Sequence, residues 1–345
     1  MSQAPAPVTL SLEQAYALAT SVLTAAGADS NAAQATASAL VRAEAQGLSS
    51  HGLSRLPQYA GFLRNGRCNA LARPAVIMDK PSSALIDADN GLAFPACALA
   101  VELGIDKARA NGSACVAVTN SHHFGVAADH LGPVAQAGMV GIALGNSPAA
   151  MPVPGGHRAV MGTNPLAACF PREHDNPIMI DLSMSEVARG KIMVAASQGQ
   201  PIPSGWALDA NGQPTTDARA ALAGSMLPLG AGTGSAKGGL IALMIELLAI
   251  SLTGAHFGAQ ADSFFQAEGN QPRLGQVFLI IDPAGFAGHA IYHERIAALV
   301  AAMQAEPGVR LPGVRRAELA DAARRNGILV AGVLHAQLIG LQSAS

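Results

Sequence analysis

The feature that most constrains the fold is an alternation of short apolar segments and amphipathic segments between residues 84 and 144. Three segments have the length and composition of buried strands, and two segments with helical spacing of apolar residues separate them. The strands are expected at 84–87, 114–119 and 140–144, and the helices at 94–110 and near 126–137. This alternation is typical of an α/β fold, in which helices cover a sheet.

Both ends of the chain favour helices. Ser11-Leu12-Glu13-Gln14 has the pattern of a capping box, in which a serine and a glutamine three residues later bond free backbone N–H groups at the start of a helix. An apolar stripe follows to Ala26, and a second helix is expected at 31–46. From about His289 onward the chain is helical again, apart from a strand-like segment at 328–330.

Beyond Pro148 the pattern changes to short strands among many proline and glycine residues. The strongest strand signals lie at 179–182 and 277–281, and one long helix is expected at 240–252. A chain of 345 residues exceeds the size at which one hydrophobic core usually stops growing, so two domains are expected. Half of the residues are hydrophobic and 13% are charged, which also allows a large interface between subunits.

Charge and hydropathy exclude several classes of protein. The formal net charge is −2, from 21 basic and 23 acidic side chains without long runs of either sign, so neither nucleic acid nor a membrane surface is an expected partner. Prolines interrupt the uncharged stretch 131–156, and Glu246 lies in the apolar helix after Gly239, so neither segment is expected to span a membrane. Residues 1–7 lack the features of a signal peptide, which predicts a cytoplasmic protein.

Histidines gather in two clusters. In Ser50-His51-Gly52-Leu53-Ser54-Arg55 a titratable imidazole precedes a guanidinium by four residues, which suits proton transfer at one end of a small carboxylate while its other end is bound. Ser121-His122-His123-Phe124-Gly125 follows the strand expected at 114–119. Taken alone, a histidine with an arginine four residues later is more often a solvated pair at a helix end.

The signatures of nucleotide binding are weak. The glycine-rich segment 230–239 does not satisfy G-x-G-x-x-G, and Lys237 is followed by glycine rather than by the Ser or Thr of a P-loop, so a Rossmann domain is not supported. Lys237 at the start of a helix offers a cation and free N–H groups to a phosphate. A plain loop at a helix start is the alternative.

Other catalytic chemistries have less support. No serine lies in G-x-S-x-G, which argues against a serine nucleophile. The candidate metal ligands lack the spacing of a zinc site, so no metal is expected; they are His51, His122, His123 and His130. The four cysteines have no C-x-x-C spacing and are expected to be structural thiols; they are Cys68, Cys97, Cys115 and Cys169.

Five motifs occur in an order that resembles one enzyme family. They are Ser50-His51-Gly52 with Arg55, Asn120 to Gly125, Gly162 to Ala167, Asp181 to Ser185 with Arg189-Gly190-Lys191, and Lys237-Gly238-Gly239. Across about residues 11–332 the chain resembles the malate/L-lactate dehydrogenase-type family, which is NAD(P)-dependent and lacks the Rossmann fold. The resemblance implies an α/β fold, with a non-Rossmann NAD(P)-binding domain built on a large mixed or antiparallel sheet at 116–289. Residues 1–115 with 290–345 would form a helical and α/β substrate-side domain.

Within that family the chain is most similar to the Δ1-piperideine-2-carboxylate/Δ1-pyrroline-2-carboxylate reductases. The similarity rests on Gly275-Gln276-Val277-Phe278 leading into Ile281-Asp282-Pro283, and on Arg310 to Gly313 followed by Arg315-Arg316. One position departs from their pattern, because Lys191 stands where these reductases have an acidic residue that completes a Ser-His-acid relay. Either the relay is not needed or the substrate differs.

The resemblance implies a role for each matched residue. His51 corresponds to the proton donor, Ser50 to the hydroxyl that orients it, and Arg55 to the clamp on the substrate carboxylate. Thr163 corresponds to a further substrate contact, and His122, the acid/base of other branches, is the reserve catalytic candidate. The residues that correspond to cofactor-binding stretches are His123, Phe124, Gly125, Val126, Ala127, Asp181, Leu182, Ser183, Ala236, Lys237, Arg310, Leu311, Pro312, Gly313, Arg315 and Arg316.

The implied function is NADPH-dependent reduction of the cyclic imino acids Δ1-pyrroline-2-carboxylate and Δ1-piperideine-2-carboxylate, to L-proline and L-pipecolate, by a cytoplasmic homodimer. The basic loop at 310–316 together with Lys237 favours NADPH over NADH, because NADPH carries an additional phosphate. An imidazole and a guanidinium would serve a 2-keto acid equally well. An NAD(P)-dependent 2-hydroxy-acid dehydrogenase of the malate or lactate type therefore stays open, as does a ligand-binding protein without turnover.

Overall fold

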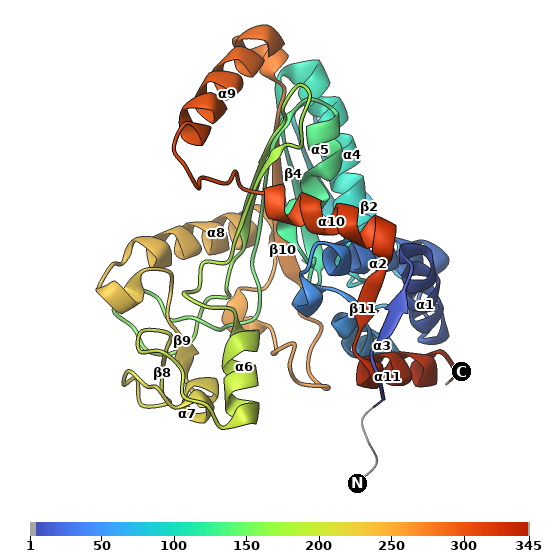
Figure 1. Cartoon of the computed structure of the whole chain (residues 1–345), viewed down its shortest axis with the longest axis vertical. Helices are drawn as coiled ribbons and strands as arrows, with labels where there is room; N and C mark the ends of the chain where they lie inside the picture. Colours follow the sequence, from blue (N-terminus) through green and yellow to red (C-terminus); the bar gives the residue numbers. More distant parts are fainter. Residues whose placement is uncertain (1–4, 344–345) are drawn as a thin grey trace.

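A seven-stranded sheet lies at the centre of the computed structural model, which describes residues 5–343 (Figure 1). β3 and β4 are parallel and every other pair of neighbours is antiparallel, so the sheet is mixed, and the predicted fold class is confirmed. In their order across the sheet, the strands are β2 (Ala75–Lys80), β3 (Ser83–Asp87), β4 (Ser113–Ser121), β10 (Leu274–Ile281), β5 (Val140–Gly145), β6 (Leu166–Phe170) and β7 (Ile178–Leu182).

All five strongly predicted strands belong to this sheet, as β3, β4, β5, β7 and β10. The position of β10 was not predicted. It lies between β4 and β5 and pairs antiparallel with both, so these two strands run in the same direction without touching. The sheet therefore differs from a doubly wound parallel sheet, in which a crossover helix would join such strands directly.

Side chains of the central strands alternate between two hydrophobic cores. In β4, Val116 and Val118 belong to the core beneath α4 (Ala93–Asn111), whereas Ala117 belongs to the core beneath α8 (Lys237–Thr253). In β10, Phe278 and Val277 alternate in the same way. Helices thus cover both faces of the central strands, and the apolar runs that predicted these strands reflect burial on both sides.

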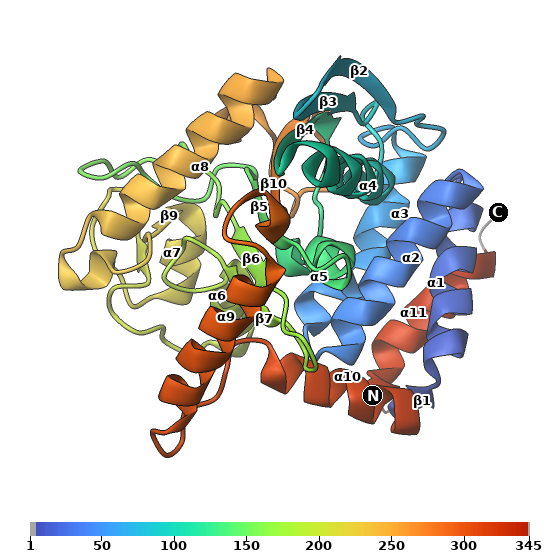
Figure 2. The same cartoon turned by 90° about the horizontal axis from the view of Figure 1, so that it is seen from above.

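The N-terminal helices share a third core with the C-terminal helix. These helices gather on one side of the molecule (Figure 2); they are α1 (Leu12–Ala25), α2 (Ser30–Ala45), α3 (Leu56–Arg64) and α11 (Gly332–Ser343). The predicted capping box is present at Ser11 and Gln14. β1 (Val8–Leu10) pairs with β11 (Ile328–Val330), so the two ends of the chain are tied together.

The helix predicted near 126–137 is divided into a 3₁₀ helix, η3 (Ala127–Leu131), and the short α5 (Gly132–Gln136). Pro133 explains the division, because a proline lacks the N–H that a continuous helix needs at that point, whereas at a helix start no partner is required. The other 3₁₀ helices are η1 (Ser49–His51), η2 (Leu53–Arg55), η4 (Ala231–Thr233), η5 (Gly258–Gln260) and η6 (Pro283–Gly285).

A small lobe lies beneath α8, on the side of the sheet away from α1 (Figure 1). It contains α6 (Arg189–Gln198), α7 (Ala218–Ala223), and a two-stranded sheet of β8 (Ala207–Leu208) and β9 (Ser225–Met226). The helical C-terminal region was predicted, and it contains α9 (His289–Gln304) and α10 (Val314–Asn326).

Within residues 5–343, no helix is long and apolar enough to cross a membrane. β2 and β3 fall in the predicted substrate-side domain but share the large sheet with strands of the predicted cofactor domain. The division into two domains stays a prediction. Residues 1–4 and 344–345, at the two ends of the predicted substrate-side domain, lie outside the described residues. Residues 1–4 also belong to the segment 1–7, in which no signal peptide was expected.

Candidate active site

Two consecutive 3₁₀ turns, η1 and η2, hold the first histidine cluster, residues 50–55, directly before α3. Glu44 in α2 fixes both turns, because it accepts hydrogen bonds from the Ser49 hydroxyl at 2.6 Å and from the Leu53 N–H at 2.8 Å. Gly52 separates the turns, and a Cβ at this position would lie 2.1 Å from a Glu44 carboxylate oxygen. A larger residue would therefore have to displace the Glu44 carboxylate from the two bonds that it makes to the turns.

His51 is held in an orientation suited to proton transfer. The Ser50 hydroxyl lies 3.0 Å from Nδ1, which leaves Nε2 for a substrate. Arg55 donates from Nε to the Ser50 carbonyl at 2.6 Å and so lies beside the imidazole. Burial, then Arg55 and Arg316, lower the pKa of His51 to about 4, so its imidazole is neutral at pH 7.

Arg55 and Arg189 face the same aromatic side chain. Their Cζ atoms lie 6.0 Å and 5.3 Å, respectively, from the centre of the Phe265 ring. Arg189 is the first residue of α6, and its buried Nε has no hydrogen-bond partner in the described part of the chain. Within residues 5–343 neither arginine forms an ion pair with a carboxylate, so both charges are available to an anion.

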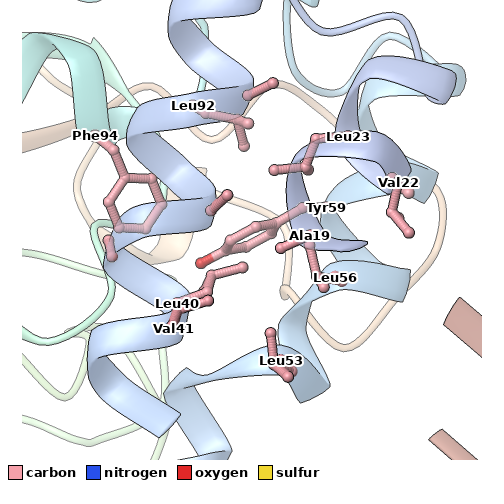
Figure 3. Packing of buried hydrophobic residues seen from close by; sticks show 14 of the residues in the cluster. Ala19, Val22, Leu23, Leu40, Val41, Leu53, Leu56, Tyr59, Leu92 and Phe94 are labelled. Carbon is pink, nitrogen blue, oxygen red and sulfur yellow. The ribbon is translucent and has the colours of Figure 1, made fainter. Parts of the chain in front are cut away.

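The second histidine cluster follows at the end of β4 and comes close to the first. His123 lies with its ring centre 5.5 Å from that of His51, and its Nδ1 lies 2.6 Å from the Tyr59 hydroxyl. Figure 3 shows the Tyr59 ring packed among Leu40, Leu56 and neighbouring apolar side chains of the N-terminal core. Burial, with smaller effects of nearby positive charges, lowers the pKa of His123 well below its usual range. The tyrosine therefore joins the helical core to the site.

His122 lies deeper than His123. It is 1% exposed, and among residues 5–343 neither of its ring nitrogens has a hydrogen-bond partner. The rings of Phe62 and Phe264 lie 5.3 Å and 5.1 Å from its ring. Burial, and secondarily Arg67, lower the pKa of His122 to about 3. The imidazole is therefore neutral and enclosed by aromatic rings, and its role as reserve acid/base stays a prediction.

Two of the predicted cofactor-binding stretches meet at the end of β7. Arg316, from α10, donates to Asp181 at 2.7 Å. The Met179 N–H donates to the Pro312 carbonyl at 3.2 Å, which packs the basic loop onto the same strand. Burial raises the pKa of Asp181, and Arg316 opposes this shift. Arg316, one of the cations expected to favour NADPH, is therefore partly neutralised by Asp181.

The stretch that begins at His123 approaches the same strand end. His130, in η3, lies with Nε2 2.7 Å from the Phe124 carbonyl, and its ring interacts electrostatically with Asp181. The backbone conformation of the stretch requires glycine at Gly125, where φ is +71° and a Cβ would lie 3.1 Å from the Phe94 ring.

Thr163 and the loop before α8 are anchored just after β7. The Thr163 carbonyl accepts a hydrogen bond from the Met184 N–H at 2.8 Å and a longer one from the Ser183 hydroxyl at 3.5 Å. The Leu229 N–H donates to the Met184 carbonyl, also at 2.8 Å. The loop that ends at Lys237 is therefore tied to the segment that carries Ser183, so the fourth predicted cofactor stretch joins the other three.

The start of α8 fits the phosphates of a nicotinamide dinucleotide. Ala236 occupies the N-cap and has no side chain that can bond the first-turn N–H groups. The Lys237 N–H donates to the Ser235 hydroxyl at 3.3 Å, and the Lys237 side chain adds a cation. A Cβ at Gly238 would lie 2.1 Å from the Leu229 carbonyl oxygen, so only glycine permits this approach. Arg310 and Arg315 are exposed and form no ion pair with a carboxylate in the described part of the chain. These donors suit a cofactor that carries several phosphate charges.

A cavity of about 730 Å³ opens between α2, α4 and α10, beside the Asp181–Arg316 ion pair. Gly313 and Arg316 belong to its lining, so it adjoins the predicted cofactor-binding loop. Arg42 and Asp129, which form an ion pair at 2.8 Å, lie on its wall. In residues 5–343, no group of three or more His, Cys, Asp or Glu side chains is arranged to hold a metal ion.

Sequence reasoning missed several side chains that enclose the site. Tyr59 and Phe264 have the appearance of ordinary core residues, and apolar spacing gives no sign that their rings surround histidines. Arg189 stood in a motif that supported the resemblance, but no role was assigned to it. Its position two residues before Lys191 was the available signal, and only the structure places it at Phe265.

Most of the chain matches one family of known proteins. Residues 10–339 match the malate/L-lactate dehydrogenase family. The chain is 50% identical to a (2R)-3-sulfolactate dehydrogenase (NADP(+)) from Chromohalobacter salexigens, over 89% of this chain and 90% of that protein. It is 36% identical to a Δ1-pyrroline-2-carboxylate reductase from Ancylobacter novellus, over 97% and 98%.

A solved structure extends the agreement to three dimensions. The Δ1-piperideine-2-carboxylate reductase from Pseudomonas syringae pv. tomato aligns with a TM-score of 0.89 at 34% identity, covering 97% of this chain and 99% of that one. Because the sequence match and the structural match both span nearly the whole chain, the protein belongs to the malate/L-lactate dehydrogenase family, as its motifs led us to expect.

Proposed function

We propose that this NAD(P)-dependent oxidoreductase interconverts a small 2-hydroxy acid and the corresponding 2-oxo acid, with NADP(H) as the preferred cofactor. The observation that carries the proposal is the unit of Ser50, His51 and Arg55. It combines a neutral imidazole, held at Nδ1 by a hydroxyl, with a guanidinium that no carboxylate of the described chain engages. This is the minimum needed to exchange a proton with the substrate hydroxyl oxygen while the neighbouring carboxylate is bound.

Each side chain has a defined task in this reaction. Arg55 binds the substrate carboxylate through parallel N–H···O bonds and fixes which face of the substrate is presented. In oxidation, His51 Nε2 accepts the proton of the substrate hydroxyl, and in reduction it returns a proton to that oxygen. The Ser50 hydroxyl both donates and accepts, so it supports either tautomer at Nδ1. The nicotinamide, when bound, accepts or supplies the hydride.

Two observations support a 2-hydroxy acid and its 2-oxo acid, rather than a cyclic amino acid and its imine, as the pair that the enzyme interconverts. Lys191 is exposed and stands where the cyclic imine reductases have an acidic relay residue, and an ammonium group cannot accept the hydrogen bond that such a relay requires. The relative at 50% identity is named as a hydroxy-acid dehydrogenase, whereas the imine reductase reported above is 36% identical.

Arg189 supports a substrate with a second anionic group. The Cζ atoms of Arg55 and Arg189 lie 6.0 Å and 5.3 Å from the centre of the Phe265 ring, so the two guanidinium groups cannot be further apart than the sum of these two distances. A short dianion can span such a distance with one anionic group at each arginine. The relative from Chromohalobacter salexigens is named for 3-sulfolactate, which carries a carboxylate and a sulfonate. We therefore include 3-sulfolactate and malate among the proposed substrates.

Reduction of a cyclic imino acid is the second candidate. His51 would supply the proton to the imine nitrogen, and Arg55 would bind the carboxylate as it does in a hydroxy acid. The match to a Δ1-pyrroline-2-carboxylate reductase over 97% of this chain favours this candidate. For either substrate, Arg310 and Arg315 support NADPH over NADH, because both are exposed cations on the predicted cofactor loop.

A substrate panel separates the candidates. NADPH oxidation is measured with sulfopyruvate, oxaloacetate, pyruvate and Δ1-pyrroline-2-carboxylate. We expect kcat/KM for a 2-oxo acid to exceed that for the cyclic imine by at least about tenfold, a difference of ~1.4 kcal/mol. The reverse order would establish the imine reductase. Binding of NADPH without turnover of any acid would point to the ligand-binding alternative.

We also propose that two copies of the chain pair through α8. This helix buries one face on the sheet through residues such as Ile245, yet its opposite face is apolar and exposed at Leu240, Ile241, Met244 and Leu247. A helix that is apolar all round is expected to be covered on both sides. Light scattering should give the mass of a dimer, and Met244→Glu should shift it toward the monomer; a wild-type monomer would overturn the proposal.

A further inference from the structure

We infer that Glu246 is a positioning residue of the active site, which holds the Thr163 turn and the loop that carries Phe264 and Phe265 in their working arrangement. The inference rests on the proposed function, because Thr163 matters as a substrate contact only if the site binds a small acid. Glu246 lies in the middle of α8 and is 4% exposed. A carboxylate so deeply buried requires several hydrogen-bond partners.

Glu246 has four such partners, and they come from three segments outside its own helix. One carboxylate oxygen, Oε1, accepts from the Gly258 N–H at 2.7 Å and from the Asn146 side-chain amide at 3.2 Å. The other, Oε2, accepts from the Asn164 side-chain amide at 2.7 Å and from the Gly162 N–H at 3.3 Å. All four groups donate, so the position suits a group that only accepts.

The turn on either side of Thr163 depends on these bonds. Asn164 has φ +38°, a left-handed conformation that costs energy for a residue other than glycine. A Cβ at Gly162 would lie 2.3 Å from the Ser147 carbonyl oxygen, so this backbone is fitted closely against the end of β5. The Thr163 N–H donates to the Ser147 hydroxyl at 3.0 Å. Glu246 thus holds both neighbours of the residue predicted to contact the substrate.

The second segment held by Glu246 leads to the aromatic wall of the site. Gly258 begins η5, and the loop after η5 carries Phe264, whose ring lies 5.1 Å from His122 and 5.3 Å from His123. The next residue is Phe265, the ring that Arg55 and Arg189 face. One buried carboxylate therefore connects the predicted substrate contact with the residues that surround the histidines.

Glu246→Gln tests the inference. The amide replaces one acceptor oxygen by an NH₂ group, which then faces two donors whichever way it is turned. With the acid that the protein turns over best, we expect KM to rise at least about tenfold and kcat to fall less than about threefold. The Kd of NADPH, measured by fluorescence, should stay within about twofold of wild type. Glu246→Asp keeps a group that only accepts and should restore part of the loss in KM.

Ile245→Val is the matched control. Ile245 is fully buried in the same helix and takes no part in the hydrogen bonds of Glu246, so this change lowers stability without altering the turn. We expect its Tm to fall and its KM to stay unchanged. If Glu246→Gln lowers Tm but leaves KM within about twofold of wild type, or if both variants raise KM equally, the carboxylate is only structural and the inference is wrong.

Hydrogen exchange gives a readout that does not need a substrate. The amides of Gly162 and Gly258 donate directly to Glu246, so their exchange should be at least about tenfold faster in Glu246→Gln and unchanged in Ile245→Val. If the wild-type protein turns over none of the acids tested, the proposed function fails, yet this measurement still decides whether Glu246 holds the two segments. Unchanged exchange at both amides would overturn the inference. If Glu246→Gln does not fold, Glu246→Asp is measured in the same way, and smaller increases at the same two amides are expected.

Discussion

Replacing His51 with alanine is the most direct test of the proposed site. Loss of the group that exchanges the proton with the substrate should lower kcat by about 10²- to 10⁴-fold. The predicted cofactor-binding stretches lie on other segments, so the Kd of NADPH should stay within about twofold of wild type. Ser50→Ala removes only the hydrogen bond at Nδ1, which is worth about 0.5–1.5 kcal/mol, so its loss in kcat should be about twofold to tenfold.

The lowered pKa of His51 also fixes the pH dependence of the wild-type enzyme. Oxidation needs the neutral imidazole, and with a pKa of about 4 this form is already complete in the free protein at neutral pH. For oxidation, kcat/KM should therefore show no break from His51 between about pH 5.5 and 8. Reduction needs the protonated form, so its kcat/KM should fall about tenfold for each unit by which the pH rises through this range.

The pH dependence of kcat/KM is measured for oxidation and for reduction, with the substrate concentration far below KM. His122→Ala is measured in the same way as His51→Ala. Near wild-type kcat in His51→Ala, together with a large loss in His122→Ala, would transfer the catalytic role to His122. A break near pH 6.5 in the oxidation series, present in wild type and absent in His51→Ala, would refute the argument in another way. It would mean that burial and Arg55 do not hold the imidazole neutral.

Three further predictions concern other residues. Arg189→Met should lower kcat/KM for sulfopyruvate or oxaloacetate by about tenfold or more and leave pyruvate nearly unchanged, since pyruvate has no second anion; equal losses would remove Arg189 from substrate selection. Arg315→Ala should reduce the ratio of kcat/KM for NADPH over that for NADH, whereas a ratio near one in wild type would contradict the cofactor proposal. His122→Phe should make the free energy of unfolding less sensitive to acid. The pKa of His122 is lowered from 6.5 to about 3 in the fold, so the unfolded chain binds the proton first and stability is lost as the pH falls below 6.5. By pH 4.5 this loss is roughly 3 kcal/mol. Urea unfolding at pH 7.5 and 4.5 measures it, and equal pH dependence in both proteins would refute it.

Local patterns predicted five of the seven strands of the large sheet, but not β2, β6 or the order of the strands. The apolar runs that became β4 and β10 are buried on both faces, which makes them recognisable from composition alone. β10 lies between β4 and β5 because of contacts between segments that are far apart in the chain. The spacing of apolar residues within one segment gives no information about such contacts. α3 was not predicted. It begins with Leu56-Pro57, where the proline lies in the first turn of the helix and needs no hydrogen-bond partner.

The candidate site shows the same limit more sharply. His51 and Arg55 are close in sequence, and the resemblance assigned both of them roles. The Asp181–Arg316 ion pair joins residues that were assigned separately, and no pattern predicted that one neutralises the other. Glu246 was noticed only as a charge inside an apolar helix. That observation was the signal of a buried, fully bonded carboxylate, but its partners lie on three other segments and only the fold identifies them.

The charges near His51 link substrate recognition to proton transfer. Arg55 helps to lower the pKa of His51, and it is also the proposed ligand of the substrate carboxylate. An anion bound at Arg55 offsets that positive charge, so the pKa of His51 should rise when the substrate binds, toward the range in which an imidazole exchanges protons efficiently near neutral pH. An uncharged molecule in the same pocket leaves the pKa low. A second anionic group at Arg189 would add to the rise, so the preference for a dianion would follow from the electrostatics of proton transfer as well as from direct contacts.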